Sequence, residues 1–121
     1  MKGGKVSKIV DDIIHDLKIS EGVKKVAVGS RDGFLISGNQ NEESETLTMM
    51  SATILRAAES IAFSLDRSCL EKVIIDFEGG RLITKSAGQK ALVSVVAATN
   101  VNMNHIETKL EKAAGKIREI F

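Results

Sequence analysis

Apolar residues recur along this chain at two spacings, and each change of spacing marks a border between a helix and a strand. Over residues 5–18 they recur every three or four positions, which is typical of an amphipathic helix. Over residues 23–29 and 34–37 they follow the shorter period of a strand. Between these two runs, Ser30-Arg31-Asp32-Gly33 contains an Asp-Gly pair that readily forms a hairpin turn. The first third of the chain therefore predicts a helix followed by a β-hairpin.

Residues 42–68 predict a long helix whose apolar surface is wider than one stripe. The main stripe consists of Leu47, Met50, Ile54, Ala58, Ile61 and Leu65, and the residues that widen it are Met49, Ala52, Leu55, Ala62 and Phe63. Between Leu47 and Leu65, only Arg56 and Glu59 are charged. A surface helix normally buries one stripe and leaves the rest in water. This helix is therefore expected to make contacts on two sides, with its own sheet and with a second copy of the chain.

The last part of the chain predicts three strands and a helix. Residues 72–78 and 81–86 alternate as half-buried strands do, whereas residues 90–98 are apolar on both faces and should lie inside the sheet. Residues 103–121 return to helical spacing. The expected fold is α+β, a five-stranded antiparallel sheet with flanking helices in the order helix-strand-strand-helix-strand-strand-strand-helix. We expect one domain over residues 1–121, with a flexible N-terminus at residues 1–5.

Composition excludes several classes of partner. The chain has 17 Lys and Arg against 16 Asp and Glu, and it has no Trp or Tyr. Nucleic-acid binders usually carry a clustered basic excess, so no nucleic-acid partner is predicted. No apolar run approaches the ~18 residues of a membrane span, so we expect a cytoplasmic protein without direct membrane insertion. The single Cys69 is interpreted as a small hydrophobic residue between a helix and a strand.

No set of residues in the sequence has the spacing of a catalytic or metal site. His15 and His105 lie among charged neighbours on predicted helices, and Asp11, Asp12 and Asp16 fit the solvated face of the first helix. A phosphate-binding loop needs a glycine-rich segment between a strand and a helix, and the glycines of this chain fall in hairpins or inside a helix. We therefore predict no catalytic residue, no metal site, no cofactor and no enzymatic activity.

The order of motifs resembles the roadblock / dynein light chain family from about residue 6 to residue 121. Residues 22–36 read Gly-Val-x-x-Val-Ala-Val-x-x-Arg-Asp-Gly-Phe-Leu-Ile, similar to the opening hairpin of that family. The other similar segments are Ala52, Ala57-Ala58-Glu59 and Ala62 in the long helix, Val73-Ile74-Ile75, Gly80-x-Leu82-Ile83 and Gly88-x-x-Ala91-Leu92-Val93 in the strands, and Ala113-Ala114 in the last helix. Each motif alone is common, and their order makes the resemblance specific.

The resemblance implies a non-enzymatic homodimer that acts as a scaffold or regulator of a small Ras-like GTPase in its GTP-bound form. Family members dimerise through the central helix and the strand that follows it, which joins two sheets into one. By position, the implied interface residues are Leu47, Met50, Ser51, Ile54, Ala58, Ile61, Val73, Ile75 and Phe77. Arg31, Arg56 and Arg67 are interpreted as solvated side chains rather than as arginine fingers.

Two other functions remain open at this point. A ligand-sensing or profilin-like binding module has the same expected architecture, because a fold does not decide a function. Such a sensor requires a cavity lined by aromatic or convergent polar groups, and four Phe residues are the only aromatic ones here apart from histidine. A self-contained enzyme is the least favoured alternative.

Overall fold

The structure, a computed structural model, describes residues 2–37, 41–66 and 69–121. Its elements confirm the predicted order of helices and strands. They are α1 (Lys2–Lys18), β1 (Val23–Ser30), β2 (Leu35–Ser37), α2 (Glu42–Asp66), β3 (Val73–Phe77), β4 (Gly80–Ser86), β5 (Ala91–Ala97) and α3 (Met103–Ile120).

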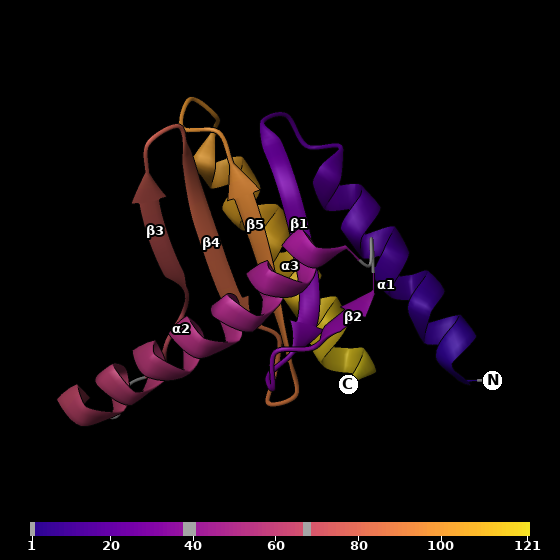
Figure 1. The fold of residues 1–121 in the computed structure, drawn as a ribbon, viewed down its shortest axis with the longest axis horizontal. Coiled ribbons are helices and arrows are strands. Elements are labelled where there is room, and N and C mark those ends of the chain that lie inside the picture. Colours follow the sequence, from indigo (N-terminus) through magenta and orange to yellow (C-terminus); the bar gives the residue numbers. More distant parts are fainter. Residues whose placement is uncertain (1, 38–40, 67–68) are drawn as a thin grey trace.

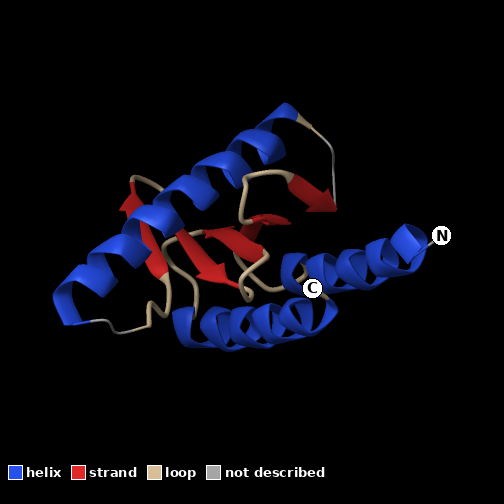
Figure 2. Cartoon of the chain, turned by 90° about the horizontal axis from the view of Figure 1, so that it is seen from below, coloured by secondary structure: helices blue, strands red, loops and turns tan. Residues whose placement is uncertain are grey.

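The five strands form one antiparallel sheet in the order β2-β1-β5-β4-β3. Helices α1 and α3 pack side by side on one face, and α2 crosses the opposite face (Figures 1 and 2). As predicted, the strand that is apolar on both faces, β5, lies in the centre, between β1 and β4. Strands β2 and β3 are the two edges. The chain is thus a three-layer α+β domain with two helices on one face of the sheet and one helix on the other.

The larger part of the core lies between the sheet and the α1–α3 layer. Apolar residues of α1 and α3 meet the inner faces of β1, β4 and β5, and the largest fully buried side chains there include Ile83, Ile106, Leu110 and Ile117. Burying a side chain of this size contributes roughly 1.5–3 kcal/mol. This layer therefore supplies most of the apolar burial, and α2 contributes a smaller cluster on the other face, built around Ala52, Leu55 and Leu92.

Small residues on the sheet let α2 lie close to it. The side chain of Thr48 on α2 is fully buried against β1, where residue 29 is a glycine. A Cβ at Gly29 would lie 2.1 Å from the Thr48 methyl carbon Cγ2 and 2.9 Å from the Phe34 carbonyl oxygen. Neither distance is compatible with van der Waals packing. The absence of a side chain at Gly29 therefore sets how closely the first half of α2 approaches the sheet.

Most element boundaries agree with the sequence prediction to within one residue. Gly33 has φ +98° in the predicted hairpin turn, and Gly22 has φ +84° in the turn between α1 and β1. Two boundaries differ. Helix α1 begins at Lys2 instead of residue 5, so it includes residues 2–5. Helix α2 is described as far as Asp66, and the predicted continuation over residues 67–68 lies outside the described residues.

Two glycine-to-alanine substitutions should have opposite effects on stability. Gly29→Ala should lower the free energy of unfolding by about 1–3 kcal/mol, because the added methyl overpacks the contact with Thr48. Gly115→Ala should raise it by about 0.5–1 kcal/mol, because a Cβ there meets nothing within 4 Å and alanine favours the helix. Chemical denaturation followed by far-ultraviolet circular dichroism measures both. Equal effects of the two substitutions would contradict the packing constraint at Gly29.

Candidate functional site

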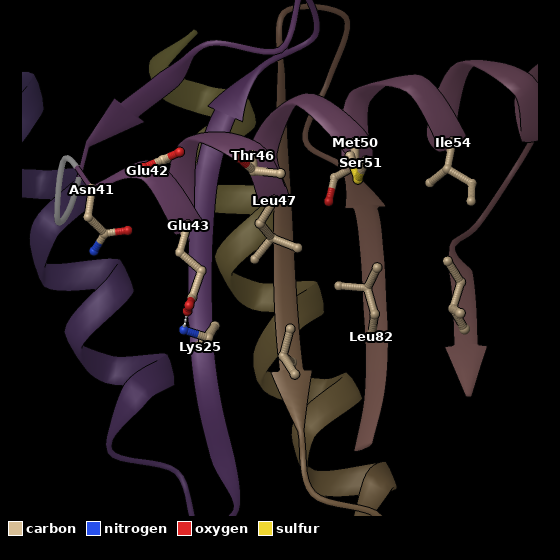
Figure 3. A pocket seen from close by; sticks show the side chains of 12 residues that line it. Lys25, Asn41, Glu42, Glu43, Thr46, Leu47, Met50, Ser51, Ile54 and Leu82 are labelled. Carbon is tan, nitrogen blue, oxygen red and sulfur yellow. Dashed lines mark ion pairs between the residues drawn. The ribbon is translucent and has the colours of Figure 1, made fainter. Parts of the chain in front are cut away.

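An apolar groove of about 960 Å³ lies between the first half of α2 and the part of the sheet that α2 leaves open (Figure 3). Its floor is a single row of side chains across four strands. The register pairs Lys25 on β1 with Val96 on β5, Val96 with Leu82 on β4, and Leu82 with Ile75 on β3. Directly opposite residues on neighbouring strands point to the same face. The floor therefore follows from sheet register, with a charged residue at one end and three aliphatic residues after it.

The wall of the groove is the main apolar stripe of α2. Leu47, Met50 and Ile54 line it, and the Met50 side chain is 66% exposed. The groove ends near the start of α2, where Lys25 forms an ion pair with Glu43 (Figure 3). This pair is about half exposed to solvent, so it contributes little to stability. The groove is thus an aliphatic surface with polar groups at one end, near the start of α2, and no aromatic side chain among its lining residues.

A triangle of buried hydroxyl groups, the hydroxyl triangle, fixes α2 on the sheet next to this groove. Ser94 Oγ donates to Ser51 Oγ at 2.8 Å and lies 2.9 Å from Thr84 Oγ1, and Thr84 Oγ1 donates to Ser51 Oγ at 3.4 Å. All three residues are at most 1% exposed. Unpaired hydroxyls at this depth cost free energy, so the bonds favour one rotation of α2 about its axis. That rotation turns Leu47, Met50 and Ile54 toward the groove.

The same stripe continues beyond the sheet. The last turns of α2 extend past β3 (Figures 1 and 2), and the stripe residues Ile61 and Leu65 are 60% and 78% exposed there. Ala58 lies between the two halves and is partly exposed. One helix therefore provides the wall of the groove at one end and an exposed apolar surface at the other.

The edge strand β3 carries the remaining predicted interface residues on the face that α2 covers. Val73 packs against the Ala52–Leu55–Leu92 cluster, Ile75 ends the floor of the groove, and Phe77 is 48% exposed. Ser51 differs from the other predicted interface residues. It lines the groove but is 1% exposed, because its hydroxyl points inward to the hydroxyl triangle. The structure thus brings the predicted set together along one groove, one helix face and one sheet edge.

A model of the Roadblock/LC7 domain matches residues 9–97 of the chain. The chain belongs to the Roadblock/LC7 domain family. Two uncharacterized proteins of Methanocaldococcus jannaschii are similar to it over their whole length. The first is 30% identical over 96% of this chain and 99% of its own length, and the second is 29% identical over 93% of this chain and 100% of its own.

Solved structures of a Roadblock/LC7 domain, of an MglB protein and of a profilin show the same fold. The domain from Streptomyces avermitilis superposes with a TM-score of 0.85 at 14% identity, covering 91% of this chain and 95% of its own. The gliding protein MglB from Thermus thermophilus gives 0.83 at 16% identity, covering 95% and 90%. Profilin II of Acanthamoeba castellanii gives 0.61 at 16% identity, covering 94% and 97%. The profilin-like architecture predicted from the sequence is therefore also present.

Arg31 of this Roadblock/LC7 domain holds three segments together. Its guanidinium donates to Glu59 of α2, to Ser86 Oγ at 3.1 Å and to the Gly88 carbonyl oxygen at 3.2 Å. Its side chain is 20% exposed, so the interpretation of Arg31 as solvated was wrong. The hairpin signal placed this arginine at a turn but did not show that α2 passes over that turn. Arg56 is exposed as predicted, and Arg67 lies outside the described residues.

The described residues contain no group of three or more His, Cys, Asp or Glu side chains that could hold a metal ion. Within the same part of the chain, no helix is long and apolar enough to cross a membrane. Cys69 lies between α2 and β3, as predicted, and its side chain is exposed. Its neighbour Leu70 packs against the cluster beneath α2 instead.

The surroundings of Lys72, at the start of the edge strand β3, shift its pKa. The pKa of Lys72 is raised above its ordinary value, chiefly by a hydrogen bond to Glu107 of α3 and then by the charge of the same carboxylate. The two groups are 3.1 Å apart. This ammonium group, at the start of the edge strand, therefore stays charged through the neutral pH range.

Removing the Ser94 hydroxyl, which makes the two shorter contacts of the hydroxyl triangle, should destabilise the domain. Ser94→Ala should lower the free energy of unfolding by about 1–3 kcal/mol, because it leaves two buried hydroxyls with only the longer bond between them. The control Ser60→Ala removes an exposed hydroxyl of α2 and should change stability by less than about 0.5 kcal/mol. Urea denaturation of the two variants gives the comparison. A Ser94→Ala variant as stable as the control would show that the triangle does not hold α2.

Proposed function

We propose that this Roadblock/LC7 domain is a non-enzymatic homodimeric scaffold or regulator that binds a small Ras-like GTPase in its GTP-bound form. The observation that carries the proposal is the apolar surface of α2. One half of its stripe lines an open groove, and the other half extends past the sheet with side chains more than half exposed. A surface of this kind marks a protein interface when it is contiguous.

A second copy fits the groove because the two halves of the stripe are complementary. If a two-fold axis runs beside β3, the exposed half of each α2 passes over the sheet edge of the other copy and reaches its groove. Such an interface is isologous, so both grooves are filled by the same contact made twice. The arrangement also covers the β3 edge, which would otherwise present unpaired backbone groups for aggregation. Leu47, Met50, Ile54, Ala58 and Ile61 then lie in the interface, with Val73, Ile75 and Phe77 beside them.

The family supports a small GTPase as the partner. The family that the sequence resembles contains scaffolds and regulators of small Ras-like GTPases, and the fold agrees with MglB over most of both chains. In this proposal the GTPase holds the nucleotide and Mg²⁺, and the dimer binds the conformation that its switch loops adopt with GTP. The domain then acts through protein contacts alone in the cytoplasm.

The size of the groove favours a second candidate, a ligand-sensing module. A volume of about 960 Å³ falls within the range of about 300–1,000 Å³ that small-molecule sites occupy. Most of its lining is aliphatic, however, and its exposed polar groups are confined to one end, near the start of α2. A groove of this composition favours an apolar helix as its occupant over a polar small molecule.

Placing a charge in the stripe should dissociate the dimer. Ile54→Asp and Ala58→Glu should each weaken self-association about a hundredfold or more, because a carboxylate would be buried without a partner. The control Ser60→Asp places the same charge at an exposed position on another side of α2 and should leave association unchanged. Sedimentation velocity over a range of concentrations measures the dissociation constants. A monodisperse monomer for the unsubstituted chain would refute the dimer itself.

Binding to a GTPase should depend on the bound nucleotide. A tagged protein in native lysate should recover a small GTPase in the presence of a non-hydrolysable GTP analogue and not with excess GDP. The Ile54→Asp variant provides the comparison, because a partner that needs the dimer is lost with it. Recovery of no GTPase under either condition from a dimeric protein would remove the proposed client and favour the ligand-sensing alternative.

A further inference from the structure

The edge strand β3 and its two flanking residues have opposite charges at opposite ends. Lys72 precedes the strand, Asp76 lies near its end, and Glu78 follows it in the turn to β4. Val73, Ile75 and Phe77 alternate with these positions and face α2. When a strand of this kind pairs antiparallel with a copy of itself, its positive end lies opposite the negative end of the copy. The strand is therefore complementary to itself in charge.

Sheet geometry restricts the registers in which two copies of β3 can pair. Opposite residues must lie on the same face of the sheet. A two-fold axis perpendicular to the sheet therefore passes midway between a residue of one strand and the same residue of its copy. An axis at Asp76 places two carboxylates directly opposite each other, which is destabilising. An axis at Ile74 pairs Lys72 with Asp76 of the second copy. An axis at Ile75 pairs Lys72 with Glu78 of the second copy.

Two observations favour the axis at Ile75. It places Phe77 opposite Val73 of the second copy, an aromatic and β-branched pair of the kind that stabilises sheets, whereas the axis at Ile74 places Phe77 opposite Glu71. Asp76 is already engaged, since its carboxylate accepts bonds from the Arg81 guanidinium on the neighbouring strand. Glu78 forms no ion pair within the described part of the chain and is exposed.

In the proposed homodimer, whose sheets join at β3 as the family resemblance implies, we propose that the two-fold axis lies at Ile75 and that contacts between Lys72 and Glu78 select a like chain as the partner. The inference rests on the proposed homodimer and specifies its register. It gives Lys72 a third acidic neighbour, beside Glu107 at 3.1 Å from its ammonium group and Glu71 at 4.0 Å. Two such contacts form in each dimer because the axis repeats them.

Choice of partner matters because related chains occur together. Methanocaldococcus jannaschii has three proteins that are similar to this one over nearly their whole length. Chains of one family share the fold and the apolar interface, so apolar contacts alone discriminate weakly among them. Charged residues at the ends of a paired strand can reject a wrong partner by placing like charges together.

Reciprocal charge reversal tests the pairing. Lys72→Glu and Glu78→Lys should each weaken self-association about tenfold, because each variant places like charges together twice per dimer. An equimolar mixture of the two variants should recover the unsubstituted affinity, because every contact then joins opposite charges. A misfolded variant cannot give this recovery. The exposed α3 substitutions Lys112→Glu and Glu119→Lys change charge equally and should have no effect, alone or mixed.

The register has its own outcomes. Recovery when Lys72→Glu is mixed with Asp76→Lys, instead of with Glu78→Lys, would place the axis at Ile74 and overturn the proposal. Unchanged affinity of both single variants in a protein that still dimerises would show that these charges do not select the partner, and would leave the homodimer intact. A monomeric unsubstituted chain would refute the proposed homodimer first.

Cysteine cross-linking provides a measurement that does not depend on Lys72. In a Cys69→Ser background, which removes the exposed native thiol, Ile75→Cys should form an intermolecular disulfide on mild oxidation. Residues paired across an antiparallel axis have Cα atoms roughly 4.5–5.5 Å apart, within disulfide range. Ile74→Cys is offset by two residues from its own copy, beyond roughly 7 Å, and should not cross-link. Cross-linking of Ile74→Cys alone would overturn the register.

Discussion

The close contact between α2 and the sheet is the constraint on which the candidate site depends. It requires a glycine under Thr48 and three small hydroxyl residues, Ser51, Ser94 and Thr84, that satisfy one another at almost no exposure. The side of α2 that meets these residues is thereby fixed, and the apolar stripe turns toward the open part of the sheet. A larger residue at any of these places would lift the helix and change the shape of the groove.

The two faces of the sheet are covered by helices to different extents. Helices α1 and α3 together cover one face and bury most of the large side chains, which makes that layer the main source of stability. A single helix cannot cover the other face, so the row from Lys25 to Ile75 stays open. The domain therefore folds around one complete layer and leaves the other layer incomplete. Its function, in the proposed reading, is to complete that layer by association.

Charge and apolar area have separate roles in this arrangement. In the proposed homodimer the stripe of α2 supplies the contact area, and this contact is unselective because burial of apolar surface is not directional. In the proposed register, Lys72 and Glu78 at the ends of β3 add little energy, but their contacts depend on register and partner. Arg31, which joins α2 to two turns through Glu59, Ser86 and Gly88, acts within the chain and keeps the helix in place. Affinity, specificity and internal order thus rest on different residues.

Periodicity alone determined the elements, the fold class and the central position of β5, because the spacing of apolar residues reflects which faces are buried. It also showed that α2 has more apolar surface than its own sheet can cover. The strand order, the inward orientation of Ser51 and the bonds of Arg31 were decided only by tertiary structure. They depend on pairs far apart in sequence, such as Lys25 with Val96 or Arg31 with Glu59, and no local pattern encodes a contact between segments that the fold alone brings together.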